Sequence, residues 1–143
     1  MHTDFGLRVL LYLAHFPEQR VGTEEISSAY GISKNHLVRV VQTLAEGGFV
    51  HVTVGRSGGL RLAKSPGEIR IGDVISVTEP SFRLVECHDT IHNTCPIVPV
   101  CGLVGVLDSA LRMFHAELNR YTLEDLVRDR SREKFVQLLT IAQ

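Results

Sequence analysis

The sequence lacks the marks of membrane-spanning and of disulfide-stabilised proteins. None of its apolar runs approaches the roughly 18 consecutive residues that a membrane-spanning helix requires. Its first residues lack the basic segment and apolar core of a secretory signal. Three cysteines are an odd number and too few for a disulfide scaffold. These absences predict a cytoplasmic protein without a membrane partner, whose 143 residues suffice for one domain with an appendage.

The net charge is small, but cations are concentrated in one stretch. The whole chain carries a formal charge of −1. Between residues 34 and 64, five cations accompany a single acid, Glu46, so this stretch carries five minus one, or +4, before histidines are counted. The five cations are Lys34, Arg39, Arg56, Arg61 and Lys64. This concentration predicts that a nucleic acid would bind here.

The first part of the chain predicts three helices. Residues 5–16 place apolar side chains at helical spacing, and Pro17 ends the pattern. A short helix follows between the N-cap Thr23 and Gly31, and a third helix begins after the N-cap Ser33. The third helix has one apolar and one polar face. The side chains of the apolar face are Leu37, Val40, Val41 and Leu44.

A glycine-rich hairpin follows the third helix. Its predicted strands are 49–54 and 60–63, and residues 55–59 form a flexible tip. Two short helices, a third helix with a polar face and a basic hairpin are typical of a winged helix-turn-helix. A further short helix is predicted over 71–78, before Pro80. The predicted fold class is therefore mostly α with a small β-wing.

The remainder of the chain contains a loop and a long apolar helix. Residues 81–101 show no periodicity, and Pro96 and Pro99 exclude regular helix around the cysteines. From Leu103 the apolar stripe is wider than packing on one side requires, which predicts a long C-terminal dimerisation helix, and Thr122 is expected to begin a capped terminal turn. The predicted regions are a winged helix-turn-helix over 1–80, a cofactor-binding loop over 81–101, and the dimerisation helix with the tail over 102–143.

The polar face of the third helix is predicted to read DNA. A helix of this length fits the major groove, where base edges present distinguishable donors and acceptors. Arg56, beside glycines at the hairpin tip, can reach a phosphate or the minor groove. The candidate DNA-binding residues are Ser33, Lys34, Asn35, His36, Arg39, Gln42, Arg56, Ser57, Gly58 and Arg61. The alternative is a merely solvated helix face, but helix spacing, caps, hairpin and local charge coincide here.

The three cysteines form a second constellation, in which Cys87, Cys95 and Cys101 follow a C-x7-C-x5-C pattern. An irregular backbone could wrap three soft thiolates around one iron–sulfur cluster or zinc ion. Structural zinc sites generally use more closely spaced cysteines, although His88 or His92 could supply a nitrogen ligand. Thiols without a cofactor are a further alternative. An enzyme with a cysteine nucleophile is disfavoured, because the sequence shows no accompanying base and orienting residue.

Several segments of the chain resemble one known family. Three of them, together with the cysteines, resemble winged-helix repressors that bind an iron–sulfur cluster: Thr3–Arg8, Ile32–Leu37 and Gly55–Ala63. Four others are similar to the nitric-oxide-sensitive repressors within that family: Val85–Cys87, Thr94–Ile97, Pro99–Cys101 and Tyr121–Leu126. The resemblance covers nearly the whole chain. A related branch, which regulates cluster biogenesis, has a histidine three residues after its last cysteine, where this sequence has Val104.

The resemblance implies a cofactor, a partner and a function. It implies a homodimer that holds a [4Fe-4S] cluster, or alternatively a [2Fe-2S] cluster, through the three cysteines and Asp4 of the partner subunit. Aspartate at a helix start is also a common cap, and His2 is another donor nearby. The implied function is a repressor that binds palindromic operator DNA with its cluster intact and releases it in response to nitric oxide. The alternative is a related iron–sulfur or thiol-based regulator that responds to oxygen or cluster status.

Overall fold

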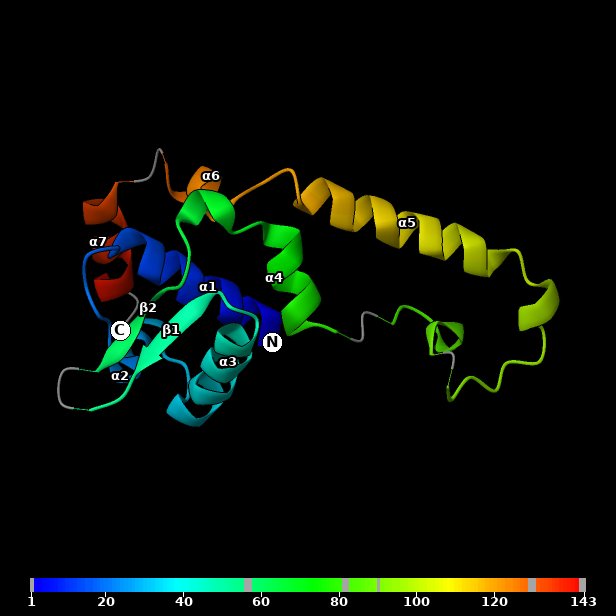
Figure 1. Cartoon of the computed structure of the whole chain (residues 1–143), viewed down its shortest axis with the longest axis horizontal. Helices are drawn as coiled ribbons and strands as arrows, with labels where there is room; N and C mark the ends of the chain where they lie inside the picture. The colour runs from blue at the N-terminus through cyan, green and yellow to red at the C-terminus, as the bar shows by residue number, and fades with distance from the viewer. Residues whose placement is uncertain (1, 56–57, 81–82, 90, 129–130, 142–143) are drawn as a thin grey trace.

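The chain folds into a body and an arm that projects from it (Figure 1). The computed structural model describes residues 2–55, 58–80, 83–89, 91–128 and 131–141. The body contains α1 (His2–His15), α2 (Thr23–Tyr30), α3 (Lys34–Glu46), β1 (Val50–Thr53), β2 (Gly59–Leu62), α4 (Ile71–Thr78), α6 (Leu123–Val127) and α7 (Arg132–Ile141). The arm comprises an irregular segment after residue 82, with short 3-10 turns at Glu86–His88 and Val98–Val100, and α5 (Leu103–Leu118). A mostly helical fold with one small β hairpin is confirmed.

Helix α1 begins three residues earlier than its apolar pattern indicates. The pattern predicted a start at Phe5, whereas the helix starts at His2. Contacts with other helices stabilise this additional turn: His2 Nε2 lies 2.9 Å from Thr43 Oγ1 of α3, and the Thr78 hydroxyl of α4 donates to Thr3 Oγ1 at 3.1 Å. The helix start is therefore set by tertiary contacts, which the apolar spacing does not record.

The predicted N-caps of α2 and α3 differ in detail from the structure. Thr23 is the first residue of α2, and the N-cap is Gly22, whose backbone is extended. The preceding residue, Val21, forms an antiparallel bridge with Leu60 of β2, and this pairing keeps the chain extended up to the cap. Ser33 is the N-cap of α3 as predicted, but its side chain makes no capping hydrogen bond. The predicted end of α2 is confirmed, because Gly31 is a left-handed C-cap with φ of 61°.

The core of the body lies between α1, α3, α4 and the hairpin. The predicted apolar face of α3 is buried, and its four side chains are each at most 5% exposed. Gly6 allows α1 to approach both neighbours closely, since a Cβ at this position would lie 3.2 Å from Thr78 Cγ2 and 3.7 Å from Leu44 Cδ2. The core side chains include Val9, Leu10, Leu13, Ile26, Leu37, Val40, Leu44, Leu60, Ile69, Val74 and Leu123.

The hairpin matches its prediction apart from its ends. Strands β1 and β2 pair antiparallel, with Val50 opposite Leu62 and Thr53 opposite Gly59. Gly58 is packed closely at the turn, because a Cβ there would lie 2.3 Å from the Thr53 carbonyl oxygen. The hairpin therefore requires glycine at position 58 to close.

The terminal helices pack on the body and not on the arm. The side chain of Leu123 in α6 is fully buried, and its amide donates to the Ile69 carbonyl at 2.8 Å. The predicted cap at Thr122 is confirmed, since the Asp125 amide donates to its Oγ1 at 3.3 Å. In α7, the Phe135 ring stacks on His15 of α1 with centroids 4.0 Å apart. Leu123 of α6 and Phe135 and Leu139 of α7 thus pack into the core of the body, whereas the predicted region boundaries at 80 and 101 stay a prediction.

Candidate DNA interface and cysteine segment

The polar face of α3 is open to solvent, as a DNA-reading face requires. Five of its predicted side chains are exposed: Lys34, Asn35, His36, Arg39 and Gln42. Lys34 forms an ion pair with Glu24 of α2, and the Gln42 amide donates to Glu46 Oε1 at 3.0 Å. Both interactions lie on the surface, where such pairs contribute little to stability and can exchange for other partners.

The hairpin lies beside α3 and adds a second basic element. Helix α3 contacts β1, and Figure 1 shows both elements on the body, away from the projecting arm. Arg61 in β2 is exposed and pairs with His51 across the hairpin. Gly58 is described, whereas the predicted contacts Arg56 and Ser57 lie outside the described residues. The structure therefore brings together a polar helix and a basic hairpin on one body.

The three cysteines lie on the arm, and each is free and half-buried. Hydrogen bonds connect the residues that precede two of them: the Thr94 amide and hydroxyl donate to Glu86 Oε1 at 2.7 and 2.6 Å. These bonds lower the pKa of the Glu86 carboxyl, because they stabilise its charged form. The Cys95 amide donates to Asn93 Oδ1 at 3.1 Å. Hydrogen bonds thus connect the two segments that carry Cys87 and Cys95, and neither thiol takes part in these bonds.

Asp89 organises the turn between these two cysteines. Its carboxylate accepts hydrogen bonds from the Ile91 and His92 amides at 3.1 and 3.2 Å, and His92 Nδ1 lies 2.9 Å from Oδ2. Arg83 contributes an ion pair at 2.5 Å. The hydrogen bond with His92 holds the pKa of Asp89 below its usual range. The two amides and Arg83 add to this effect, and burial opposes it. One ring nitrogen of His92 is therefore engaged by a carboxylate within the loop.

His88 connects the loop to α5. Its side chain is 8% exposed, and its Nε2 lies 3.4 Å from Asp108 Oδ1 of α5. Neither ring nitrogen has a hydrogen-bond partner of good geometry within the described chain. This histidine therefore packs against the helix of the arm.

Asp4 lies on the body, in the first turn of α1, and is separated from the cysteines on the arm. Its exposed carboxylate forms an ion pair with Arg8 at 3.0 Å. Across the described residues, no three histidine, cysteine, aspartate or glutamate side chains are grouped as ligands of a metal ion. The donor set itself, three soft thiols and one exposed carboxylate, fits the chemistry of an iron–sulfur cluster. One subunit alone does not bring these donors together.

Helix α5 has an extensive apolar surface, and none of its residues is buried in the described chain. Leu103, Val106 and Met113 are 54%, 64% and 71% exposed. Its C-terminal end is attached to α4, since the Asn119 Nδ2 donates to Asp73 at 3.2 Å and Arg70 donates to the Asn119 carbonyl at 2.6 Å. An exposed apolar surface of this kind marks a protein interface.

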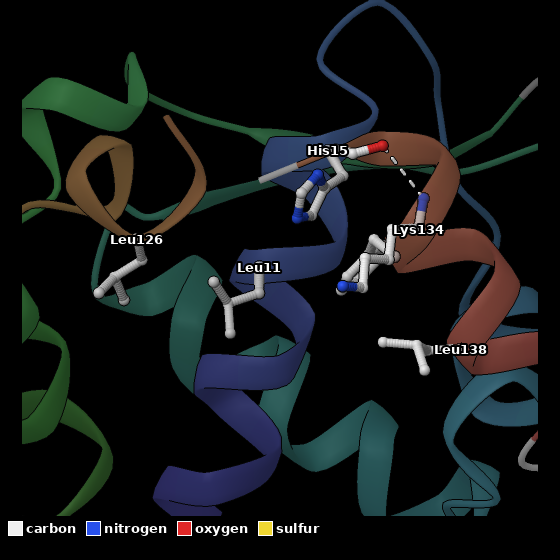
Figure 2. A pocket seen from close by; sticks show the side chains of 7 residues that line it. Leu11, His15, Leu126, Lys134 and Leu138 are labelled. Carbon is white, nitrogen blue, oxygen red and sulfur yellow. Dashed lines mark hydrogen bonds between the residues drawn. The ribbon is translucent and has the colours of Figure 1, made fainter. Parts of the chain in front are cut away.

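A cavity of about 450 Å³ lies where α7 meets α1 and α6 (Figure 2). Leu11, Leu126 and Leu138 line it together with His15 and Lys134. Burial and the nearby positive charge of Arg132 lower the pKa of His15. Both effects favour the neutral imidazole at this contact between two helices.

Sequence reasoning did not identify some residues that shape these sites. The Glu86–Thr94 hydrogen bonds and the contact between His88 and Asp108 have no signal in sequence spacing. Val38 is half-exposed beside the polar face of α3. Its exposure could have been predicted from the helical period, because Val38 follows the buried Leu37 by one residue.

A helix with an exposed polar face and a basic hairpin on the same compact body define a winged-helix DNA-binding protein. The chain belongs to the Rrf2 family, described as iron-dependent transcriptional regulators, whose sequence profile matches residues 1–129. It is 43% identical to the HTH-type transcriptional regulator NsrR of Bacillus subtilis (strain 168) over 143 residues, which cover 99% of this chain and 97% of that protein.

Two solved structures have the same fold. The T. potens IscR superposes with a TM-score of 0.71 at 25% identity, covering 92% of this chain and 86% of that chain. CymR (YrzC), the global cysteine regulator of B. subtilis, superposes with a TM-score of 0.68 at 25% identity, covering 92% and 96% of the two chains. The protein is a transcriptional regulator, as predicted. Within the described residues, no helix is both long enough and apolar enough to cross a membrane.

Proposed function

We propose that this regulator is a nitric-oxide-responsive repressor, whose homodimer binds operator DNA in the cluster-loaded form and releases it after exposure to nitric oxide. The observation that carries this proposal is the set of three free, half-buried thiols on one irregular segment outside the core. Structural cysteines are usually buried and inert, whereas accessible thiols on an irregular backbone can bind a metal centre. The similarity to NsrR supports the same reading.

The proposed ligands are Cys87, Cys95 and Cys101 of one subunit and Asp4 of the partner subunit. The thiolates suit a [4Fe-4S] cluster, with a [2Fe-2S] form as the alternative. When bound, the cluster supplies iron that reacts with nitric oxide. The bonds between Glu86 and Thr94 restrict the backbone beside two ligands. Asp4 is exposed and already placed at a helix end, so a second subunit could reach it once Arg8 releases its carboxylate.

The apolar surface of α5 is the proposed dimerisation surface. Pairing of two such helices would bury side chains such as Leu103, Val106 and Met113, which are solvent-exposed in one subunit. A two-fold dimer would also present two copies of α3, which favours a palindromic operator. Because one proposed ligand comes from the partner subunit, cluster binding would favour one arrangement of the two bodies over others.

The proposed DNA contacts divide by role. Asn35, His36, Arg39 and Gln42 face the major groove, and Ser33 and Lys34 lie at the start of the same helix. The residues of the wing contact the DNA phosphate backbone or enter the minor groove, and they are Arg56, Ser57, Gly58 and Arg61. The proposal includes a cytoplasmic location, where such a repressor would meet its operator.

The test is an anaerobic comparison of the wild-type protein with Cys95→Ala. We expect the wild-type dimer to contain iron and sulfide, to absorb in the visible range, and to lose both the absorbance and its DNA affinity on addition of nitric oxide. Cys95→Ala should retain little iron. DNA binding is measured on the duplex that the iron-loaded wild type enriches from a random pool.

Three results would contradict the proposal in different ways. A colourless protein that contains zinc would identify a structural metal site. A protein that binds DNA without metal and responds to thiol oxidants would identify a redox switch. An iron-loaded protein that releases DNA with oxygen but not with nitric oxide would replace the proposed signal and leave the cluster in place.

A further inference from the structure

Val38 lies at the edge of the polar surface of α3, next to its buried face. Its helix neighbours Lys34 and Gln42 are exposed and its neighbour Val41 is buried, yet Val38 is 50% exposed and does not belong to the buried core. Asn35 precedes it by three residues and Gln42 follows it by four, so all three lie on the same stretch of helix surface. Removing a half-exposed apolar side chain from water is favourable, so a partner that covers Val38 would bind more tightly.

The surroundings of Val38 favour DNA over a protein as that partner. The neighbouring Lys34, Asn35 and Arg39 are exposed, and such cations and amides bind phosphates and base edges. The central part of a protein interface is depleted of charged side chains instead. An exposed apolar surface that is suited to a second subunit lies on α5, in a different part of the molecule.

The major groove offers an apolar partner at thymine. Among the four bases, only thymine presents a methyl group there, on its C5 atom, and small apolar side chains contact it. Valine is branched at Cβ and has one strongly preferred side-chain rotamer in a helix. Its methyl groups therefore have fixed positions before DNA binds, and little side-chain entropy is lost on contact.

We propose that Val38 selects a thymine in each operator half-site by packing against its C5 methyl group. This rests on the proposed function, in which α3 enters the major groove. One helical turn rises about 5.4 Å and base pairs are about 3.4 Å apart, so the thymine lies within about two base pairs of the base that Asn35 contacts. Asparagine pairs best with adenine, which predicts an A·T-rich centre of the half-site.

The decisive experiment removes the methyl group from the DNA and the valine from the protein separately. The probe is a duplex of about three helical turns, enriched from a random pool by the iron-loaded dimer. Each thymine is replaced in turn by deoxyuridine, which lacks only the C5 methyl. At one thymine per half-site, we expect the substitution to weaken wild-type binding about fourfold, the effect of exposing one methyl-sized group.

Val38→Ala should bind the unmodified duplex more weakly and should not respond to deoxyuridine at that thymine, because the contact is already absent. Its salt dependence should equal that of the wild type, since no phosphate contact is lost. Val136→Ala, at an exposed position of α7, is the matched control and should keep the wild-type response to deoxyuridine. Val38→Thr retains one methyl group and should keep part of the response.

Equal effects of every deoxyuridine substitution on the wild type and on Val38→Ala would overturn the proposal. Arg39→Ala separates this failure from failure of the proposed function. If Arg39→Ala weakens binding but Val38→Ala shows no coupling to any thymine, α3 reads DNA and only the role of Val38 is wrong. If both variants bind as tightly as the wild type, α3 does not face DNA and both proposals are wrong.

Discussion

Replacing Leu123 should show how strongly the C-terminal segment is joined to the DNA-binding body. Its side chain is fully buried in the core and connects α6 to α1 and to the segment before α4. The chain between α4 and α6 contains every cysteine of the protein. Leu123 therefore anchors the returning end of the arm without contributing to the proposed cofactor site.

The expected loss of stability for Leu123→Ala follows from burial. Truncation of a fully buried leucine removes its transfer free energy and leaves a cavity, which together cost about 2 to 5 kcal/mol. A middle value of about 3 kcal/mol, divided by a urea dependence of about 2 kcal/mol per molar, lowers the unfolding midpoint by about 1.5 M. Natural domains have unfolding free energies of about 5 to 15 kcal/mol, so the variant should still fold.

The assay is urea unfolding followed by far-UV circular dichroism at one fixed protein concentration, because the proposed dimerisation would make stability depend on concentration. Leu138→Ala is the matched control: the same substitution at a side chain that is 60% exposed should change the unfolding free energy by at most about 0.5 kcal/mol. Equal, small effects of the two substitutions would refute the docking of α6 into the core.

Three further predictions concern Arg39, Asp4 and His15. Arg39→Ala should weaken operator binding, measured by fluorescence anisotropy, by about 1 to 3 kcal/mol. The visible absorbance of the cluster should be unchanged. Full affinity would show that the reading face is misplaced. Asp4→Ala should shorten the lifetime of the cluster in air without preventing its assembly, and a lifetime equal to that of the wild type would exclude Asp4 as a ligand. Burial and Arg132 lower the pKa of His15 in the folded protein below that of the unfolded chain. The fold therefore has its full stability above the ordinary histidine pKa, and this contribution is lost as the pH falls through the lowered pKa of the folded protein. The unfolding free energy should therefore decrease in mildly acidic solution, and His15→Gln should reduce that dependence; an unchanged slope would show that His15 is not the group that titrates.

Local signals predicted several elements correctly. The helix over 71–78 follows from apolar spacing, and the end of α2 at Gly31 follows from the conformational freedom of glycine. The buried face of α3 follows from its helical period. The hairpin strands were displaced by only a residue at their ends, because Gly58 and its neighbours mark the turn.

Elements that depend on distant contacts were predicted less well. The start of α1 was placed at Phe5, three residues too late. The hydrogen bond between His2 and Thr43 helps to stabilise the first turn, and it joins residues 41 positions apart, which local spacing does not record. The cap at Thr23 was wrong by one residue, because the bridge between Val21 and Leu60 fixes the entry to α2. The cysteine ligands stay a prediction, since their spacing and chemistry were read from sequence and one subunit does not group them.

The sequence by itself determined the periodic and chemical features of this protein: a winged-helix order of elements, a polar recognition face, and three thiols in a proline-containing loop. Each depends on spacing within a short segment, where side-chain period and backbone preference act locally. Only the tertiary structure decided that α6 and α7 return to the body, that α5 has no buried residue, and that Asp4 and the cysteines lie on different parts of the molecule. These arrangements depend on which apolar surfaces pack together across long stretches of chain, and the period within any one segment does not encode that choice.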